Sequence, residues 1–480
     1  MITFIICLSF LVLGYAFYSR YIEKVFGANA DNQTPAYKMR DTVDYIPMPW
    51  WRVFLIQFLN IAGLGPIFGA LAGAMWGPVA FIWIVFGTIF GGAVHDYFSG
   101  MLSIKHNGLS VTEIIGIYLG LTAKQVMRLF TVVLMVLVGA VFIMGPAKIL
   151  SGLTPDYATM TFWVIVIFVY YVLATLLPID KIIGRVYPVF GAALVFMALG
   201  LIVALIVKGY HLPELTPGNL HNFHYDNEKF PIFPLLFISI ACGAISGFHA
   251  TQSPLMARCI KNEKEGRKVF YGAMIVEGVV ALIWAAIGMS FFGGIRELNT
   301  VMAEHQGNAA WAVNEISNSL LGKFGGILAI LGVVAAPITS GDTAFRSARL
   351  IVADFLKMKQ GPIINRLWIT IPLFTTGFLL TRVNFDIIWR YFAWANQTLA
   401  TVFLWTITVY LLLERKKYQI TLLPALFMTY VISTYILLAP EGFALSKPIS
   451  YTIGGTITAS VFIVFLLYKK NTARKIKTSS

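Results

Sequence analysis

The chain has 480 residues, of which 58% are hydrophobic and only 12% are charged, and its mean hydropathy is +0.77. Soluble domains carry roughly 25% charged residues, so too little charge is left here to cover a water-facing surface. The composition excludes a soluble multidomain protein, a disordered chain, a collagen-like repeat and a secreted disulfide scaffold. The sequence therefore predicts an all-α polytopic membrane protein in contact with the lipid bilayer.

The excess of basic over acidic residues is explained by the cytoplasmic loops of a membrane protein. The formal net charge is +14, from 36 basic and 22 acidic residues. Nucleic-acid binding would fit this charge, but membrane proteins retain Lys and Arg in their cytoplasmic loops, and we expect no nucleic-acid partner. Cys7, Cys242 and Cys259 lie in or beside apolar runs without metal-ligand spacing, so we interpret them as small apolar side chains.

Apolar runs define the predicted helices, because a spanning helix needs about 20 apolar residues. We interpret the first run as an anchor with its N-terminus outside, because Arg20 and Lys24 follow it and no basic residue precedes it. The thirteen predicted spans cover approximately 1–19, 52–74, 77–101, 127–149, 159–178, 188–208, 232–256, 269–293, 323–345, 364–381, 388–413, 420–439 and 449–468.

The loop charges give the predicted orientation. With thirteen spans, 28 of the 36 basic residues fall on one side of the membrane and 8 on the other. This is the positive-inside pattern, with the N-terminus outside and the C-terminus cytoplasmic. The longest outer loops are then 209–231 and 294–322. Of the outer histidines, His211, His221 and His224 have irregular spacing, so we expect solvated loop residues rather than a metal site.

Three predicted spans contain interruptions, at residues 60–66, 242–254 and 335–343, where glycine, proline and polar residues replace the apolar run. Unpaired backbone is costly in lipid, so broken helices occur only where protein or a water-filled cavity surrounds them. Packing of small residues between helices is the alternative explanation for the glycines.

The two strongest interruptions, at 60–66 and 242–254, lie in the first and sixth predicted helices after the anchor. Five helices is an odd number, so a second group of five must enter the membrane from the opposite side. The sequence thus predicts a five-plus-five inverted repeat with a transport site near the bilayer midplane. The predicted regions are an anchor and linker (1–51), a first repeat (52–208), a second repeat (232–413), and two peripheral helices with a basic tail (420–480).

The broken helices also suggest the polarity of the ligand. A half-helix N-terminus offers free N–H groups and a partial positive charge, which favour a carboxylate. We therefore expect a small carboxylate or zwitterion as substrate, and no organic cofactor. The predicted substrate-binding residues are Asn60, Ala62, Gly63, Gly65, Ser246, Gly247, His249, Thr251 and Gln252.

Two coupling ions fit the sequence. Ala336, Thr339 and Ser340 share one helical face, and with Ala62 and Gly65 they could form an oxygen cage for Na⁺. Equally, the two hydroxyls could hydrogen-bond to carbonyls one turn earlier. No other metal is expected.

Protons are the second coupling ion that the sequence allows. Ionisable residues inside a membrane are expensive and are functional by default. His249 titrates near neutrality when unperturbed, and Glu113 and Glu277 are weaker candidates. The residues predicted for gating or proton relay are His95, Asp96, Asp342 and Arg346, although Asp342 and Arg346 have the spacing of a structural salt bridge.

Three long motifs carry a family resemblance. Residues 57–103, 247–254 (GFHATQSP) and 339–354 (TSGDTAFRSARLIVAD) resemble the carbon starvation protein A family. The resemblance implies a bacterial inner-membrane transporter for peptides or pyruvate, induced under carbon starvation. It also implies the five-plus-five fold of the amino acid–polyamine–organocation superfamily.

The expected function is therefore secondary active import of a small carboxylate-bearing nutrient, a peptide or pyruvate, coupled to H⁺ or Na⁺. The alternatives are a membrane-embedded nutrient sensor and an intramembrane enzyme. We do not expect an enzyme, because the chain contains no HExxH, GxSxG or GxxxxGK[ST] motif.

Overall fold

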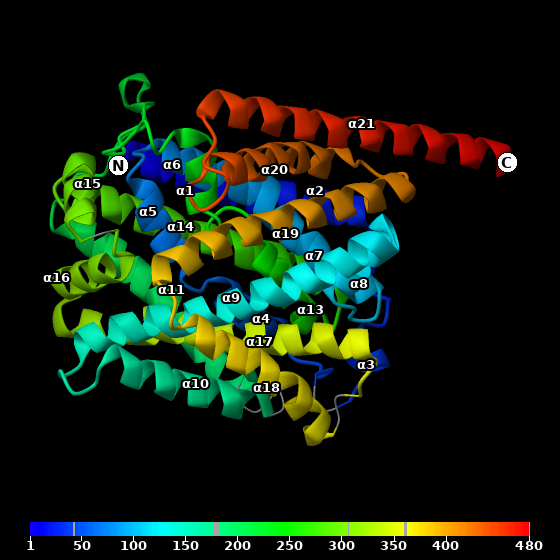
Figure 1. Cartoon of the computed structure of the whole chain (residues 1–480), viewed down its shortest axis with the longest axis horizontal. Helices are drawn as coiled ribbons and strands as arrows, with labels where there is room; N and C mark the ends of the chain where they lie inside the picture. Colours follow the sequence, from blue (N-terminus) through cyan, green and yellow to red (C-terminus); the bar gives the residue numbers. More distant parts are fainter. Residues whose placement is uncertain (42–43, 177–182, 306, 360–361, 480) are drawn as a thin grey trace.

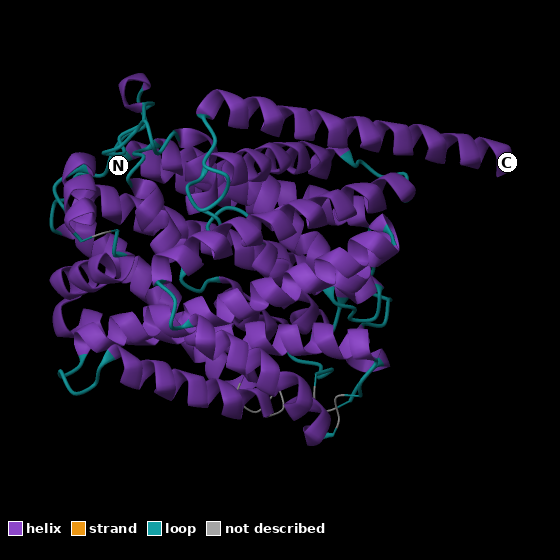
Figure 2. Cartoon of the chain, viewed as in Figure 1, coloured by secondary structure: helices purple, strands orange, loops and turns teal. Residues whose placement is uncertain are grey.

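The computed structural model describes residues 1–41, 44–176, 183–305, 307–359 and 362–479. Every regular element in these ranges is a helix (Figure 2), and strand-like pairing there is limited to one parallel bridge between Met48 and Ile260. The predicted all-α class is confirmed.

Most of the long helices run along one direction, with the N-terminus at one end of the bundle and the C-terminus beyond the other (Figure 1). We call the end that holds Met1, α15 and the 209–231 loop the N-terminal face. The first elements are α1 (Ile2–Leu13), η1 (Gly14–Tyr18), α2 (Ser19–Phe26), α3 (Pro35–Lys38), α4 (Trp50–Ile61), η2 (Gly65–Gly69), α5 (Ala70–Ala74), α6 (Val79–Ile82), η3 (Trp83–Gly92), α7 (Ala93–Lys105), α8 (Val111–Leu119), α9 (Leu121–Leu153), α10 (Met160–Leu176) and α11 (Ile183–Val207).

The second part of the chain follows the short helix η4 (Pro217–Asn219). Its elements are η5 (Ile232–Leu236), α12 (Phe237–Ser239), α13 (Gly247–Ala257), η6 (Glu263–Glu265), η7 (Arg267–Tyr271), α14 (Gly272–Phe291), α15 (Ile295–Glu304), α16 (Ala309–Ala329), η8 (Ile330–Val334), α17 (Ala335–Leu356), α18 (Ile363–Leu380), α19 (Phe385–Leu413), α20 (Gln419–Leu438) and α21 (Lys447–Ser479).

Among the described residues, nine helices are long and apolar enough to cross a membrane, and there are ten if α4 and the bent η2–α5 segment count as one span. The chain is therefore a multi-pass membrane protein. Residues 177–178 of the predicted fifth span lie outside the described ranges, and α10 ends at Leu176.

The core lies around α17, which packs against α4, α9, α10, α11 and α13. Helices α9 and α18 approach α17 closely because each has a glycine, Gly139 and Gly377, against the ring of Phe345 in α17. This packing of small against large side chains is typical of helices inside membranes. In contrast, α21 lies at the edge of the bundle and projects beyond it (Figure 1).

The predicted interruption at 335–343 is wrong, because α17 is helical from Ala335 to Leu356. The Thr339 and Ser340 hydroxyls donate to the Ala336 carbonyl at 2.7 and 2.9 Å, as Thr and Ser commonly do within helices. Gly341 lies against the Tyr171 ring, and a Cβ at this position would overlap the phenol. The polar and small residues here serve packing within a continuous helix.

The segment 294–322, predicted as an outer loop, is largely helical. It contains α15 and the first part of α16, which bends at Gly322 where φ is 59°. Asn308 starts α16 by accepting a hydrogen bond from the Trp311 amide at 3.2 Å. These helices contain too many polar residues to form an apolar run, so a search for spanning segments passes over them.

Candidate functional site

The first predicted break is confirmed. Helix α4 ends at Ile61, and the chain resumes at Gly65 in η2 and α5 after a bend of 55°. Pro66 stands in the first turn of the new segment, where its missing N–H costs nothing. Residues 62–64 form the gap, and all three are buried.

The second predicted break, at 242–254, is confirmed only in part: the observed break covers residues 240–246 between α12 and α13, and residues 247–254 are helical in α13. Side chains from neighbouring helices bind its free backbone groups. The Asn396 Oδ1 atom accepts hydrogen bonds from the Phe248 amide at 2.6 Å and the Ser246 hydroxyl at 3.1 Å. Trp83 and Thr88 donate to the carbonyls of 240 and 243 at 2.9 and 3.1 Å. The break is thus held open by polar partners rather than by water alone.

The two breaks touch each other inside the protein. A Cβ at Gly65 would overlap the Cys242 side chain, so only glycine allows this approach. One turn further along, Gly69 lies against the carbonyl oxygen of Ser239. Segments separated by about 175 positions in the sequence therefore meet at a buried junction.

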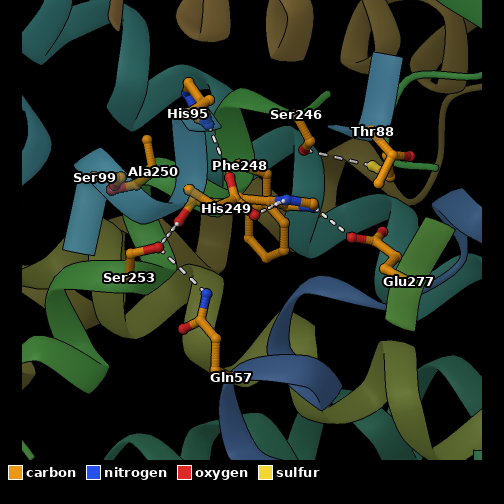
Figure 3. A network of polar contacts seen from close by, with 12 residues as sticks. Gln57, Thr88, His95, Ser99, Ser246, Phe248, His249, Ala250, Ser253 and Glu277 are labelled. Carbon is orange, nitrogen blue, oxygen red and sulfur yellow. Dashed lines mark hydrogen bonds and ion pairs between the residues drawn. The ribbon is translucent and has the colours of Figure 1, made fainter. Parts of the chain in front are cut away.

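Beside this junction lies a chain of four fully buried ionisable side chains (Figure 3). The His249 Nδ1 atom lies 2.8 Å from the Asp96 Oδ2 atom, and its Nε2 atom lies 3.4 Å from the Glu277 Oε2 atom. On the other side, the His95 Nδ1 atom lies 2.8 Å from the Asp96 Oδ1 atom. The order is therefore His95, Asp96, His249 and Glu277, contributed by α7, α13 and α14.

This buried chain can hold and exchange protons. Two carboxyls and two imidazoles lie together away from water, where unbalanced charge is costly. Within the described residues, neither oxygen of Glu277 receives a hydrogen bond, and the Nε2 atoms of both histidines also lack one. The number of protons on the four groups must therefore compensate the buried charge. His249 lies between the two carboxyls, hydrogen-bonded to Asp96 and close to Glu277.

Several amides near the breaks have unused hydrogen-bonding capacity. The side chain of Asn60 is buried, and neither its Oδ1 nor its Nδ2 atom has a partner among the described residues. The Oε1 atoms of Gln57 and Gln252 are also buried and also lack a hydrogen-bond partner among the described residues. Buried polar atoms normally have partners, so these three side chains are candidates to bind a polar solute or water. Thr251 donates to the Phe248 carbonyl at 2.7 Å and accepts from Gln252 at 2.9 Å.

Sequence reasoning missed Gln57, Ser253 and Asn396. Gln57 donates to the Ser253 hydroxyl at 3.3 Å, and Ser253 donates to the His249 carbonyl at 3.0 Å (Figure 3). Gln57 lies one turn before Asn60 on the same helix face, which is a signal that the spacing contained. Asn396 stands with Gln397 inside an otherwise apolar run, and an intramembrane amide of this kind marks a hydrogen-bonding role.

Of the residues predicted for the oxygen cage, Ser340 lies next to the first break. Ser340 donates to the Leu59 carbonyl at 3.0 Å, which brings α17 against the last turn of α4 before the break. Gly63 lies beside the same hydroxyl. Thr339 points its hydroxyl back to the carbonyl of Ala336, as described above. The structure therefore joins α17 to the first break through Ser340.

Asp342 and Arg346 are buried and have separate partners. Tyr187 donates to the Asp342 Oδ2 atom at 2.9 Å. Arg346 forms an ion pair with Asp44, with 3.4 Å between the Nη1 and Oδ1 atoms, and donates to the Ala174 carbonyl at 3.3 Å. Asp44 belongs to the segment between α3 and α4, so Arg346 ties that segment to α17.

Comparison with known proteins now gives the family. The model of the family described as carbon starvation protein CstA matches residues 1–162 and 154–320. The chain belongs to the CstA family. An uncharacterized membrane protein of Haemophilus influenzae is 44% identical, over 63% of this chain and 94% of its own length.

Named relatives of this CstA-family chain are transporters. The peptide transporter CstA of Bacillus subtilis is 26% identical over 88% of each chain. The pyruvate/proton symporter BtsT of Escherichia coli is 27% identical over 57% of this chain, which spans about half (47%) of the symporter's length. A solved structure of a manganese transporter from Eremococcus coleocola superposes with a TM-score of 0.51 at 13% identity, covering 91% of this chain and 99% of that chain. This last likeness shows the fold alone.

Proposed function

We propose that the chain is a secondary active importer of a small carboxylate-bearing nutrient, a peptide or pyruvate. The observation that carries the proposal is the buried contact between the two breaks, where Gly65 lies against Cys242. Broken helices at the midplane expose backbone groups that can bind a solute while the rest of the span stays hydrogen-bonded. The names of the Bacillus subtilis and Escherichia coli relatives support peptide and pyruvate as the two substrates to test.

The transport cycle that we propose uses two inverted five-helix repeats, 52–208 and 232–413, among thirteen spans. Each repeat opens with a broken helix, α4–α5 in the first and α12–α13 in the second. Rocking of one repeat against the other would expose the junction to each side in turn. In this arrangement the N-terminal face is the outer face of the bacterial inner membrane, and the C-terminus is cytoplasmic.

The substrate carboxylate is placed at the start of α13, where the helix N-terminus favours negative charge. Asn396 now holds the Phe248 amide and the Ser246 hydroxyl, and a carboxylate could exchange with it. The unused amides of Gln57, Asn60 and Gln252 would then bind the polar remainder of the solute.

Coupling to H⁺ is favoured by the buried chain that runs from His95 to Glu277. Its two carboxyls flank His249 at 2.8 and 3.4 Å: the Asp96 contact is a hydrogen bond, and the Glu277 contact would shorten to hydrogen-bond distance when a proton passes to that carboxyl. Coupling to Na⁺ remains the second candidate, through carbonyls of Ala62, Gly65 and Ala336 and the hydroxyls of Thr339 and Ser340. Ser340 favours it because its hydroxyl already contacts α4 next to the first break.

Uptake into proteoliposomes tests the function. Radiolabelled pyruvate and dialanine are offered under an imposed pH gradient, an imposed Na⁺ gradient, or neither. We expect accumulation of at least one substrate that depends on a gradient; a protonophore should abolish uptake driven by the pH gradient, and a sodium ionophore uptake driven by the Na⁺ gradient. Absence of uptake of both substrates under every gradient would contradict the importer.

The double substitution Thr339→Ala with Ser340→Ala distinguishes coupling to Na⁺ from coupling to H⁺. It removes both hydroxyls of the proposed cage, so any Na⁺ dependence of uptake should disappear while the pH dependence stays. If a Na⁺-dependent flux persists unchanged in this variant, the cage is not the sodium site.

A further inference from the structure

The N-terminal face contains a cavity of about 300 Å³, separate from the junction of the two breaks. We call it the vestibule and define it by six of its lining residues: Phe68, Lys148, Ser239, Phe385, Trp389 and Arg390. Its volume reaches the lower end of the range for small-molecule sites. The vestibule would hold a solute with a few carbon atoms.

Among the described residues that line the vestibule, two are cations, Lys148 and Arg390, and none is a carboxylate. The Lys148 ammonium lies 5.6 Å from the centre of the Phe385 ring, and the ion pairs found among the described residues do not include it. Arg390 directs its Nε atom toward Glu441 at 3.6 Å, which leaves its terminal N–H groups for another acceptor. Lysine and arginine that converge in this way provide donors for an anion.

His224 also lines the vestibule, and it adds no charge at neutral pH. Burial lowers the pKa of this loop imidazole to about 4, and its ring lies 4.7 Å from that of Trp76. Among the described lining residues, the positive charge of the vestibule therefore comes from Lys148 and Arg390.

The vestibule leads to the two breaks. Phe68 belongs to η2, directly after the first break, and Ser239 ends α12, directly before the second. From Trp389 a series of aromatic rings runs through Phe392 and Phe142 to Phe248. The centres of successive rings in this series are 5.5, 6.1 and 5.8 Å apart. Phe248 is the neighbour of His249 in the chain. We call this series of rings, which runs from the vestibule wall to the start of α13, the aromatic layer.

We propose that the vestibule is a separate binding site for small carboxylates, in which Lys148 and Arg390 hold the anion before it passes the aromatic layer. This inference rests on the proposed import function and on the N-terminal face being the outer face. The anion gains charge-assisted hydrogen bonds from the two cations, and the rings of Phe385 and Trp389 cover its carbon atoms.

The test combines uptake with binding, using pyruvate as the probe. Lys148→Gln removes one charge from the vestibule, and Lys148→Arg keeps it. Lys208→Gln is the matched control, because Lys208 carries the same charge near the N-terminal face but donates to the Ser319 carbonyl outside the vestibule. Equilibrium binding of pyruvate and of the uncharged ester methyl pyruvate is measured on each purified protein.

We expect Lys148→Gln to raise the KM for pyruvate about tenfold with kcat nearly unchanged, as the loss of one charge-assisted contact implies. Pyruvate binding should weaken by the same factor, more so after the added Arg390→Gln change, while methyl pyruvate binding stays constant. Lys148→Arg and Lys208→Gln should behave like the unaltered protein.

The outcomes separate the vestibule from the transport function. Equal KM and equal pyruvate affinity in Lys148→Gln and Lys208→Gln would overturn the vestibule site and leave the importer standing. If the unaltered protein transports no substrate but binds pyruvate through Lys148, the importer fails and the vestibule is supported. If the unaltered protein binds no pyruvate, the vestibule site is overturned.

Discussion

The two breaks are built in different ways. The first, at 62–64, is short and depends on small residues, with Gly65 pressed against the side chain of Cys242. The second, at 240–246, is longer and is held by donated and accepted hydrogen bonds, above all by Asn396. The first break thus requires a residue without a side chain, and the second requires hydrogen-bonding partners. Substitutions that add volume should damage the first, and those that remove polar atoms should damage the second.

The largest effect is expected at Gly65. A methyl group in Gly65→Ala would overlap Cys242, and overpacking of this kind costs about 1–3 kcal/mol. If this cost falls on the transport-competent conformation, uptake should drop about 10- to 100-fold, and Gly65→Leu should abolish it. Membrane insertion should be unaffected, as measured by the yield of protein in the bilayer.

The matched control is Gly91→Ala, another buried glycine, which lies in η3. A Cβ there would lie 3.5 Å from the Ile245 side chain, an ordinary contact. This variant should transport normally. Equal losses in both variants would contradict the idea that volume at the first break is what matters.

The next largest effect is expected at His249, where the second break adjoins the buried ionisable chain. His249→Ala removes the imidazole between Asp96 and Glu277, so proton-driven uptake should fall at least about tenfold and its pH profile should flatten. Uptake rates across pH 5–8 measure this. His221→Ala, in the exposed 209–231 loop, is the control. An unaltered pH profile in His249→Ala would move the coupling assignment to Na⁺.

A smaller effect is expected at Asn396. Asn396→Ala leaves the Phe248 amide and the Ser246 hydroxyl without their acceptor, and unsatisfied buried groups cost about 1–3 kcal/mol. The apparent melting temperature in detergent should fall. Thr398→Ala, which only loses a hydrogen bond to Trp394 in its own helix, should change it little. If both variants melt alike, side chains do not hold the second break.

The smallest effect is expected far from both breaks, at Glu214. This loop carboxylate accepts hydrogen bonds from the N-terminal ammonium of Met1 and from Thr3 and the Ile2 amide, which lower its pKa to about 2. A lowered folded-state pKa gives stability that is present above the ordinary value of 4.5 and is lost as the pH falls toward 2. Because Glu214 is exposed, the gain is below about 1 kcal/mol.

Thermal unfolding between pH 7 and pH 3 measures this effect. The unaltered protein should lose slightly more stability on acidification than Glu214→Gln, and uptake at pH 7 should be the same in both. A large loss of transport in Glu214→Gln would show that function is not confined to the breaks and their neighbours.

The sequence predicted the all-α class and the first break well, and the second break in part, because these features follow from local composition. Apolar length marks a span, and glycine with proline at 63–66 marks a place where a helix restarts. The same reasoning failed at 335–343, because Gly341 there accommodates the Tyr171 ring and the hydroxyls bond within the helix. Local composition does not distinguish a glycine that frees the backbone from one that admits a neighbouring ring.

The site itself was predictable only in pieces. His95, Asp96 and His249 were each identified, but nothing in the sequence places Glu277 next to His249, since α13 and α14 belong to different spans. The role of Asn396 depends in the same way on α19 packing against the second break. Contacts between distant spans arise from tertiary packing, so they became visible only with the structure.

The central claim is that the two breaks meet and together bind the solute. The most direct test is an electron cryo-microscopy structure of the protein in nanodiscs with the substrate found in the uptake assay. We expect solute density that touches both the 62–64 segment and the start of α13, within hydrogen-bond distance of Ser246 or His249. Solute bound elsewhere, with both breaks unoccupied, would contradict it.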